Sequence, residues 1–186
     1  MRRKQILYCI LALFFSIHCR ENVEMAYTPP GEDEVADQEG WDSIITSTSS
    51  GRLTSKIAYA HMKQYNSKRL VVFDRGVEIS FFNDQGQLIS VVKGDSALLW
   101  QQNENLELFG NVVVNSEEGV DLFSEELKWD DESQLVTAEE LVTVITTAND
   151  TIHGVGFESN KAFDKWIIKK PWGVTQKKIR FERDED

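Results

Sequence analysis

Hydrophobic and polar residues alternate along most of the chain after residue 53, with the period of two that is typical of β-strands. Val77, Ile79 and Phe81 give one example, and turn-forming residues such as those at 83–86 interrupt the pattern about every ten residues. Residues 54–64 also fit one face of a helix, but their β-branched and aromatic side chains favour a strand. The pattern therefore predicts an all-β sandwich, roll or barrel of antiparallel strands.

Two segments of the chain repeat each other closely. Residues 95–100 and 124–129 both carry Leu in the fourth place and Trp in the sixth. Repeated strand-and-turn units bury their apolar faces against their neighbours. The matched Trp100 and Trp129 are therefore interpreted as residues with a common packing role, although exposed tryptophans would instead favour glycan binding.

The N-terminus resembles an export signal. Basic residues at 2–4 precede an apolar run at 6–17, which is shorter than the ~20 residues of a membrane-spanning helix. Cys19 ends this run, as in bacterial lipoprotein signals, and would become the lipidated first residue. The bulky His18 departs from that pattern, so an uncleaved helical anchor and ordinary cleaved secretion remain alternatives.

Composition divides the chain into four parts. Residues 1–19 are the signal or anchor segment, and residues 20–50 read as a polar, acidic linker. Residues 51–174 form the predicted β-domain, followed by a charged tail at 175–186. Cysteine is absent after residue 19, so no disulfide contributes to the stability of the domain.

Charge and residue spacing exclude several functions. The net charge of −11 argues against nucleic-acid binding, which needs a basic surface. His61 and His153 lack metal-ligand spacing and are interpreted as structural residues, and no nucleophile or nucleotide motif is present. We therefore expect neither an enzyme nor a bound cofactor or metal.

Four motifs together carry a family resemblance. They are residues 81–88 (Phe-Phe-Asn-Asp-Gln-Gly-Gln-Leu), 109–114 (Phe-Gly-Asn-Val-Val-Val), 119–130 (from Gly-Val-Asp-Leu to Glu-Leu-Lys-Trp-Asp) and 142–157, which ends in Ile-His-Gly-Val-Gly-Phe. In order and spacing they resemble the LptC family, the periplasmic component of the lipopolysaccharide export ABC transporter. The Cys-ended signal and polar linker are similar to the lipoprotein form of that family.

The resemblance implies an OstA-like β-jellyroll, open along a seam, whose apolar interior binds lipopolysaccharide acyl chains. It implies a periplasmic protein anchored to the inner membrane through lipidated Cys19 or an N-terminal helix. Its implied partners are lipopolysaccharide, the inner-membrane ABC transporter and a periplasmic bridge jellyroll that resembles LptA. An envelope lipoprotein that binds glycans through its tryptophans and a purely structural β-scaffold are the alternatives.

Two sets of candidate residues follow. If the apolar phase of each strand points inward, the lipid groove is lined by Val77, Ile79, Phe81, Leu88, Val92, Leu106, Leu108, Val112, Val114, Val120, Leu122, Val142 and Val144. By resemblance, the edge that meets the bridge protein lies between residues 154 and 168 and includes Gly154, Gly156, Phe157, Trp166 and Ile168. Glycines inside a strand mark a bulge or a close backbone approach.

Overall fold

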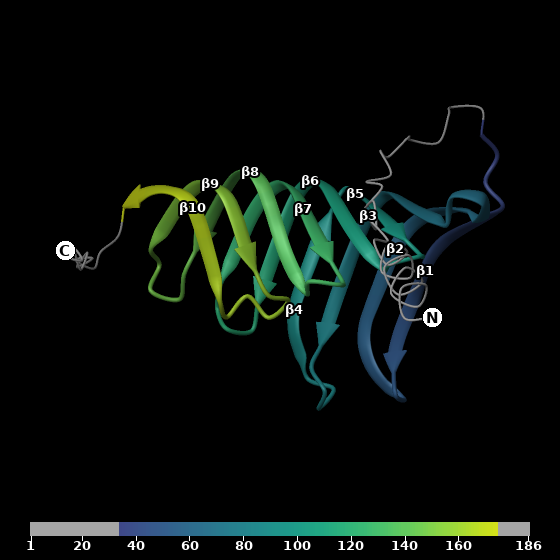
Figure 1. The fold of residues 1–186 in the computed structure, drawn as a ribbon, viewed down its shortest axis with the longest axis horizontal. Helices are drawn as coiled ribbons and strands as arrows, with labels where there is room; N and C mark the ends of the chain where they lie inside the picture. Colours follow the sequence, from purple (N-terminus) through teal and green to yellow (C-terminus); the bar gives the residue numbers. More distant parts are fainter. Residues whose placement is uncertain (1–33, 175–186) are drawn as a thin grey trace, which may run out of the picture. The chain divides into compact units, whose positions relative to one another are not determined.

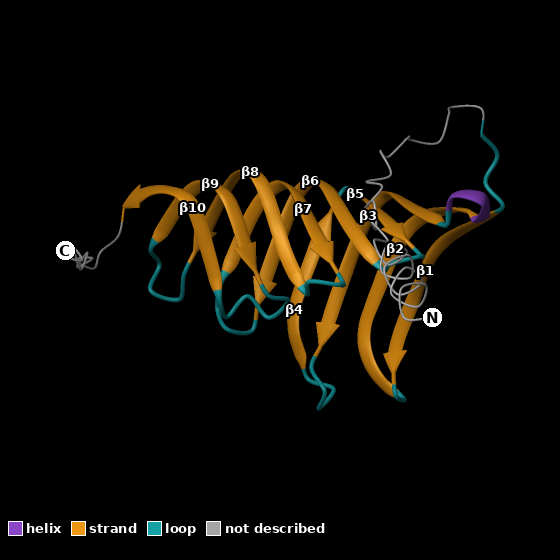
Figure 2. Cartoon of the chain, in the orientation of Figure 1, coloured by secondary structure: helices purple, strands orange, loops and turns teal. Residues whose placement is uncertain are grey.

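The computed structural model describes residues 34–174, and these form an antiparallel β-structure with a single short 3₁₀ helix, η2, at Asn66–Lys68 (Figures 1 and 2). No helix in this part of the chain has the length and hydrophobicity needed to cross a membrane. The strands are β1 (Gln38–Ser49), β2 (Arg52–Tyr65), β3 (Leu70–Phe82), β4 (Leu88–Gly94), β5 (Ser96–Trp100), β6 (Asn105–Ser116), β7 (Asp121–Asp130), β8 (Leu135–Ile145), β9 (Thr151–Ser159) and β10 (Trp166–Val174).

Apart from β4 and β5, strands that follow one another in the sequence pair with each other. The sheet order is β1-β2-β3-β4-β6-β7-β8-β9-β10, and β5 pairs with β3 and β6. Because β4 and β5 pair with the same two strands and are separated only by Asp95, they act together as one bent strand. The predicted all-β fold is confirmed.

The long strands bend near their middles. The register shifts at Tyr59/His61, at Phe109/Val112 and between Ala138 and Leu141. Gly76 and Gly156, which have a positive φ, lie opposite the first and the last of these shifts. An extra residue in one strand of a pair bends that strand, and glycine adopts a positive φ without steric cost. The acidic pairs at 125–126 and 139–140 lie at the register shifts of β7 and β8, and their side chains are exposed or partly exposed to solvent.

Asp95 organises this line of bends. Its backbone N–H donates to the carbonyls of Phe109 and Gly110, its carbonyl accepts from Gly76 N–H at 2.8 Å, and its carboxylate accepts from Asn111 Nδ2 at 2.7 Å. A Cβ on Gly110 would lie 2.7 Å from Asp95 Oδ2. Position 110 therefore favours glycine for two reasons: the Asp95 side chain lies close to its Cα, and its φ is positive, at 73°.

The bends divide the sheet into two walls that enclose one hydrophobic core. The first wall comprises residues 62–65, 70–73, 97–100, 105–109, 126–130, 135–138, 157–159 and 166–168. The second wall comprises residues 55–59, 77–82, 88–94, 112–116, 121–124, 141–145, 151–155 and 170–174. The bends close one side of this folded sheet, and the opposite side, where the strand ends meet, is called the seam below.

The linker expected at residues 20–50 ends earlier than predicted. A compact unit begins at Val35, and residues 38–49 form strand β1, which pairs with β2 along almost its whole length. Its side chains are mostly exposed, so composition alone resembles that of a linker. Backbone hydrogen bonds to β2 supply the stability that burial does not. Residues 54–64 belong to β2, so the strand interpretation of this segment is confirmed.

The matched tryptophans do not share one role. Trp100 pairs with Leu70 and Asn105, whereas Trp129 pairs with Leu106, the next residue along β6. Because successive residues of a strand point to opposite faces, the two indoles lie on opposite faces of the first wall. The expected common packing role is therefore wrong, and only Trp129 packs against the core.

Candidate functional site

An unbroken row of aliphatic residues crosses the second wall. Each member is the cross-strand partner of the next, from β1 to β9, at a separation that lets such side chains touch. The row is Ile45, Ile57, Ile79, Val92, Val114, Leu122, Val144 and Ile152. Its inner members are almost completely buried, and its two end members are only partly buried.

The first wall carries a second, more mixed row. It consists of Val71, Leu99, Leu106, Trp129, Val136, Ser159 and Trp166. Most of these side chains belong to the core or pack against it. The space between the walls is therefore lined by hydrocarbon over nearly the whole succession of strands.

The structure places the predicted inward residues on this interior with two exceptions. All of them are buried except Phe81, which is half-buried and packs against the core, and Leu88, which is 36% exposed. Leu88 begins β4 beside the register shift between Phe81 and Phe82, so its expected inward position is wrong. Further along the same strand, Ser90 and Val92 are buried, so the chosen phase holds there.

Sequence reasoning missed most of the first wall. The predicted set contains only Leu106 and Leu108 from it, yet this wall also buries Val71, Phe73, Leu127, Val136 and Ala138. A usable signal was present in the alternation of Val136 with Ala138. Short runs in which every residue is apolar do not indicate which side chains point inward, because both faces of such a strand are apolar.

The interior is packed, and aromatic side chains meet across the seam. Phe81 of the second wall and Trp129 of the first have ring centroids 6.3 Å apart. Val114, Leu122, Val142 and Val144 have no exposed surface. Around these residues the protein's own side chains fill the space between the walls, because apolar walls without a ligand gain stability by packing on each other.

The predicted partner-edge residues separate into two groups. Trp166 and Ile168 lie on β10, which pairs only with β9 among the strands of residues 34–174 and is the last of them. Gly154, Gly156 and Phe157 lie on β9, which is hydrogen-bonded on both sides, and Phe157 is 1% exposed. These three residues shape the core and the bend of β9, so their expected place at an edge is wrong.

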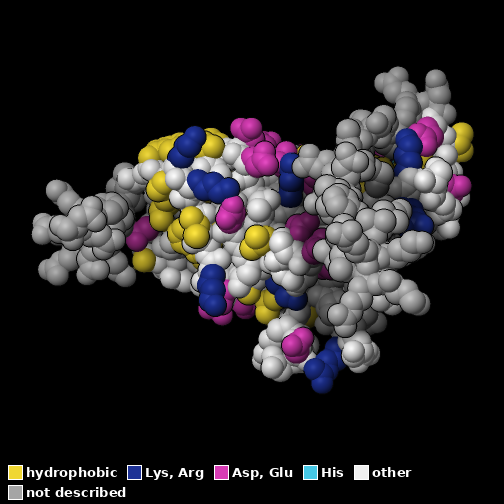
Figure 3. Space-filling model, in the orientation of Figure 1, with side chains coloured by type: hydrophobic (Ala, Val, Ile, Leu, Met, Phe, Trp, Pro, Cys, Tyr) yellow, Lys and Arg dark blue, Asp and Glu magenta, His cyan; other side chains and the backbone are white. Residues whose placement is uncertain are grey.

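Exposed hydrophobic side chains gather on the last strands. Figure 3 shows them at the end of the β-structure that carries β9 and β10. Ile167 and Trp172 of β10 and Leu141 of β8 are each more than half exposed. Isolated exposed hydrophobics are ordinary, but several near an unpaired strand edge mark a surface suited to contact with another protein.

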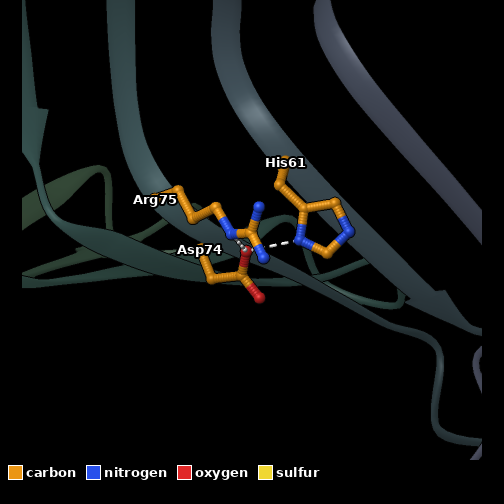
Figure 4. A network of polar contacts seen from close by, with 3 residues as sticks. All are labelled: His61, Asp74 and Arg75. Carbon is orange, nitrogen blue, oxygen red and sulfur yellow. Dashed lines mark hydrogen bonds and ion pairs between the residues drawn. The ribbon is translucent and has the colours of Figure 1, made fainter.

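Contacts of the buried His61 side chain connect the first three strands. His61 is 5% exposed, and its Nδ1 lies 2.5 Å from Asp74 Oδ1, with Arg75 Nε 3.9 Å from the same oxygen (Figure 4). Trp41 of β1 stacks on the His61 ring at 5.1 Å. No group of three His, Cys, Asp or Glu side chains within residues 34–174 is placed to hold a metal ion. His61 thus has a structural partner at the bend of β2.

Three carboxylates surround one lysine on the outer face of the first wall. Glu107 pairs across the strands with Lys128, whose Nζ lies 3.2 Å from Glu126 Oε1. Burial raises the pKa of Glu107; Lys128 opposes this shift, and the Glu126 and Glu139 charges add to it. Folding therefore disfavours the ionised form of Glu107, and its contribution to stability decreases as the pH rises.

We expect Lys128→Gln to lower the free energy of unfolding more at about pH 7 than at about pH 4. Because its pKa is raised, Glu107 is ionised to a greater extent at the higher pH, and the lysine charge then offsets its repulsion by Glu126 and Glu139. The loss should stay below about 1 kcal/mol because Lys128 is partly exposed. Urea denaturation at both values measures the difference. Lys93→Gln, which breaks the exposed pair with Glu78, is the control and should show a smaller change between the two pH values. Equal losses at both values would contradict the prediction.

Comparison with known proteins agrees with this architecture. The family model for LptC-related lipopolysaccharide-assembly proteins matches residues 35–166. Among solved structures, the chain is similar to LptH, the LptA-homologous periplasmic component of the lipopolysaccharide transport device of Pseudomonas aeruginosa. That likeness has a TM-score of 0.50 and 11% identity, and it covers 70% of this chain and 90% of LptH. No curated protein sequence matches significantly. The chain belongs to the LptC-related family of lipopolysaccharide-assembly proteins.

Proposed function

We propose that this protein binds the acyl chains of lipopolysaccharide between its two walls and passes them from the inner-membrane ABC transporter to the next periplasmic jellyroll. Membership of a lipopolysaccharide-assembly family supports the transport role. The acyl-chain site rests on one observation, the aliphatic row that runs from Ile45 to Ile152 without a polar interruption. Burial of a CH₂ group stabilises by ~0.8 kcal/mol, so several alkyl chains bind such a surface without specific polar contacts.

The charge of the protein supports the orientation of the lipid. The chain carries a net charge of −11, and acidic side chains lie on the outer faces and at the bends. A phosphorylated sugar headgroup is repelled by this surface, whereas the alkyl chains are attracted to the interior. The lipid therefore enters with its chains inward and its headgroup outside the seam.

The glycan alternative receives less support. Trp129 packs against the core, and Trp100 is half-buried on the outer face of the first wall, so the pair forms no common stacking surface for sugars. The two most exposed tryptophans, Trp41 and Trp172, lie on the opposite edge strands β1 and β10. A structural scaffold without lipid is the outcome if the experiment below fails.

Site-specific photo-crosslinking tests the proposal. A photo-reactive amino acid at Leu108 of the first wall or Val144 of the second should capture lipopolysaccharide, because both side chains face the interior. The adjacent residues Glu107 and Thr143 point to the outer face and are the matched controls. Absence of lipid at the inner positions, or equal capture at inner and outer positions, would reject the acyl-chain site.

We also propose that the chain is held at the inner membrane through its N-terminus. Cys19 lies outside the described residues, as does the charged tail at 175–186. The apolar run before Cys19 supports a lipidated anchor, with a helical anchor or simple cleavage as the alternatives. Mass spectrometry of the native N-terminus distinguishes an acylated Cys19 from a free Met1.

A further inference from the structure

The segment between β9 and β10 crosses the seam. Residues 160–165, here called the strap, leave the first wall after Ser159 and return to it at Trp166. Ser90 Oγ of β4 donates to the Lys161 carbonyl at 2.7 Å, and Ser116 Oγ of β6 donates to the Ala162 carbonyl at 2.8 Å. In Figure 1 the strap runs along the lower margin of the strands, toward β4.

The two serines mark the rim of the second wall. Ser90 and Ser116 are direct cross-strand partners, and each lies beyond the aliphatic row on the side away from the bends. They occupy the same inward phase as Val92 and Val114. The strap therefore connects the rim of one wall to the rim of the other, directly over the hydrocarbon interior.

Phe163 inserts from the strap into the core. Its side chain has no exposed surface, although both following residues, Asp164 and Lys165, are exposed. Its ring lies 6.3 Å from that of Phe157, which in turn lies 6.4 Å from that of Trp166. A loop residue thus fills apolar space between the walls, and it does so from a left-handed backbone conformation with φ of 57° that is unusual for a bulky side chain.

Few hydrogen bonds connect the strap to other parts of the described chain. Apart from the two serine hydroxyls, its hydrogen bonds are local, as from Phe163 N–H to the Asn160 carbonyl at 3.1 Å. Asn160 Oδ1 is buried without a hydrogen-bond partner. An unsatisfied buried acceptor and a strained residue both favour release, because water satisfies the acceptor and the backbone relaxes once the segment opens. Segments held in this way open locally without global unfolding.

We infer that the space filled by Phe163, beside Phe157 and Trp166, is an acyl-chain subsite that the strap covers when no lipid is bound. This inference rests on the proposed function. A saturated hydrocarbon chain offers the same apolar contact as the phenyl ring, so it replaces Phe163 while the strap moves off the rim. Lipid binding and strap closure then compete for one surface, and each lowers the population of the other.

The double variant Ser90→Ala/Ser116→Ala tests this inference. It removes both hydroxyl donors that the second wall offers to the strap; the local bond from Ser159 Oγ to the Lys165 carbonyl and the core side chains stay in place. We expect amide hydrogen exchange of residues 160–165 to accelerate about five-fold or more, and photo-capture of lipopolysaccharide at Val144 to increase at sub-saturating lipid. Addition of lipopolysaccharide to the wild-type protein should accelerate exchange of the same segment.

Ser124→Ala is the matched control. Its buried hydroxyl also donates to a backbone carbonyl, that of Glu126 at 2.8 Å, but lies in β7 away from the strap. This variant should leave both exchange of 160–165 and lipid capture unchanged. Phe163→Ala is a second test that frees the subsite directly, and it should increase capture at Val144 provided that the strands keep their exchange protection.

The outcomes separate the inference from the proposed function. Faster exchange of the strap with unchanged lipid capture overturns the inference, while capture by the wild type still supports the acyl-chain site. Unchanged exchange of 160–165 in the double variant also overturns it, because the hydroxyls then do not hold the strap. Failure of the wild type and all variants to capture lipid at Leu108 and Val144 rejects the proposed function, and the inference with it.

Discussion

Leu122→Ala is expected to lower the free energy of unfolding by about 2–5 kcal/mol. Leu122 has no exposed surface and stands in the middle of the aliphatic row, between its cross-strand partners Val114 and Val144. Truncation removes buried methyl groups and leaves a cavity that the flanking strands cannot fill without losing their hydrogen bonds. Urea denaturation of the wild type and the variant measures the difference.

The neighbouring residue supplies the control for this experiment. Phe123 follows Leu122 in β7 but points to the outer face, where it is 39% exposed. Phe123→Ala removes a larger side chain, yet we expect it to cost about 1 kcal/mol or less. If both variants were equally destabilised, the assignment of Leu122 to the interior and Phe123 to the outside would be wrong.

Gly154→Ala should detach the last strand from the sheet and cost about 1–3 kcal/mol. A Cβ at this position would lie 2.0 Å from Ile168 Cγ2 and 2.9 Å from the Lys170 carbonyl oxygen, so the backbone of β10 has to move. Amide hydrogen exchange should therefore rise mainly in residues 166–174, with a loss of stability in urea.

Gly86→Ala is the control for Gly154→Ala, because it adds backbone strain without steric crowding. Gly86 has a φ of 76° and no atom within 4 Å of the added Cβ, so only the conformational penalty of about 1 kcal/mol applies. This variant should leave the exchange of β10 unchanged. Faster exchange in β10 for both variants would indicate a general loss of stability and contradict a local effect of Gly154.

Sequence reasoning recovered the strand pattern well, because alternation and turn residues are local properties. The hairpin turn at 83–86 and the strand at 112–114 needed no tertiary information. The inward phase of the second wall also followed, since Ile79, Val114 and Val144 alternate with polar or less buried neighbours. The family resemblance, based on four motifs, agrees with the family match over residues 35–166.

Features that depend on partners across the sheet escaped prediction. β1 looks like a linker because its stability comes from pairing with β2 and not from its own side chains. The repeat in the sequence predicts equivalent tryptophans, but the strand register places Trp100 and Trp129 on opposite faces of the first wall. Phe163 stands in a polar loop sequence, and nothing in that sequence indicates that the loop crosses to Ser90 and Ser116.

The strap also differs from the remainder of the fold in how far apart its contacts are along the chain. Consecutive strands form by closing short hairpins, which costs little chain entropy and permits rapid assembly. Ser90 and Lys161, by contrast, are separated by 71 positions, and their contact can form only after the intervening strands have assembled. Closure of the strap is therefore expected to be the last step of folding.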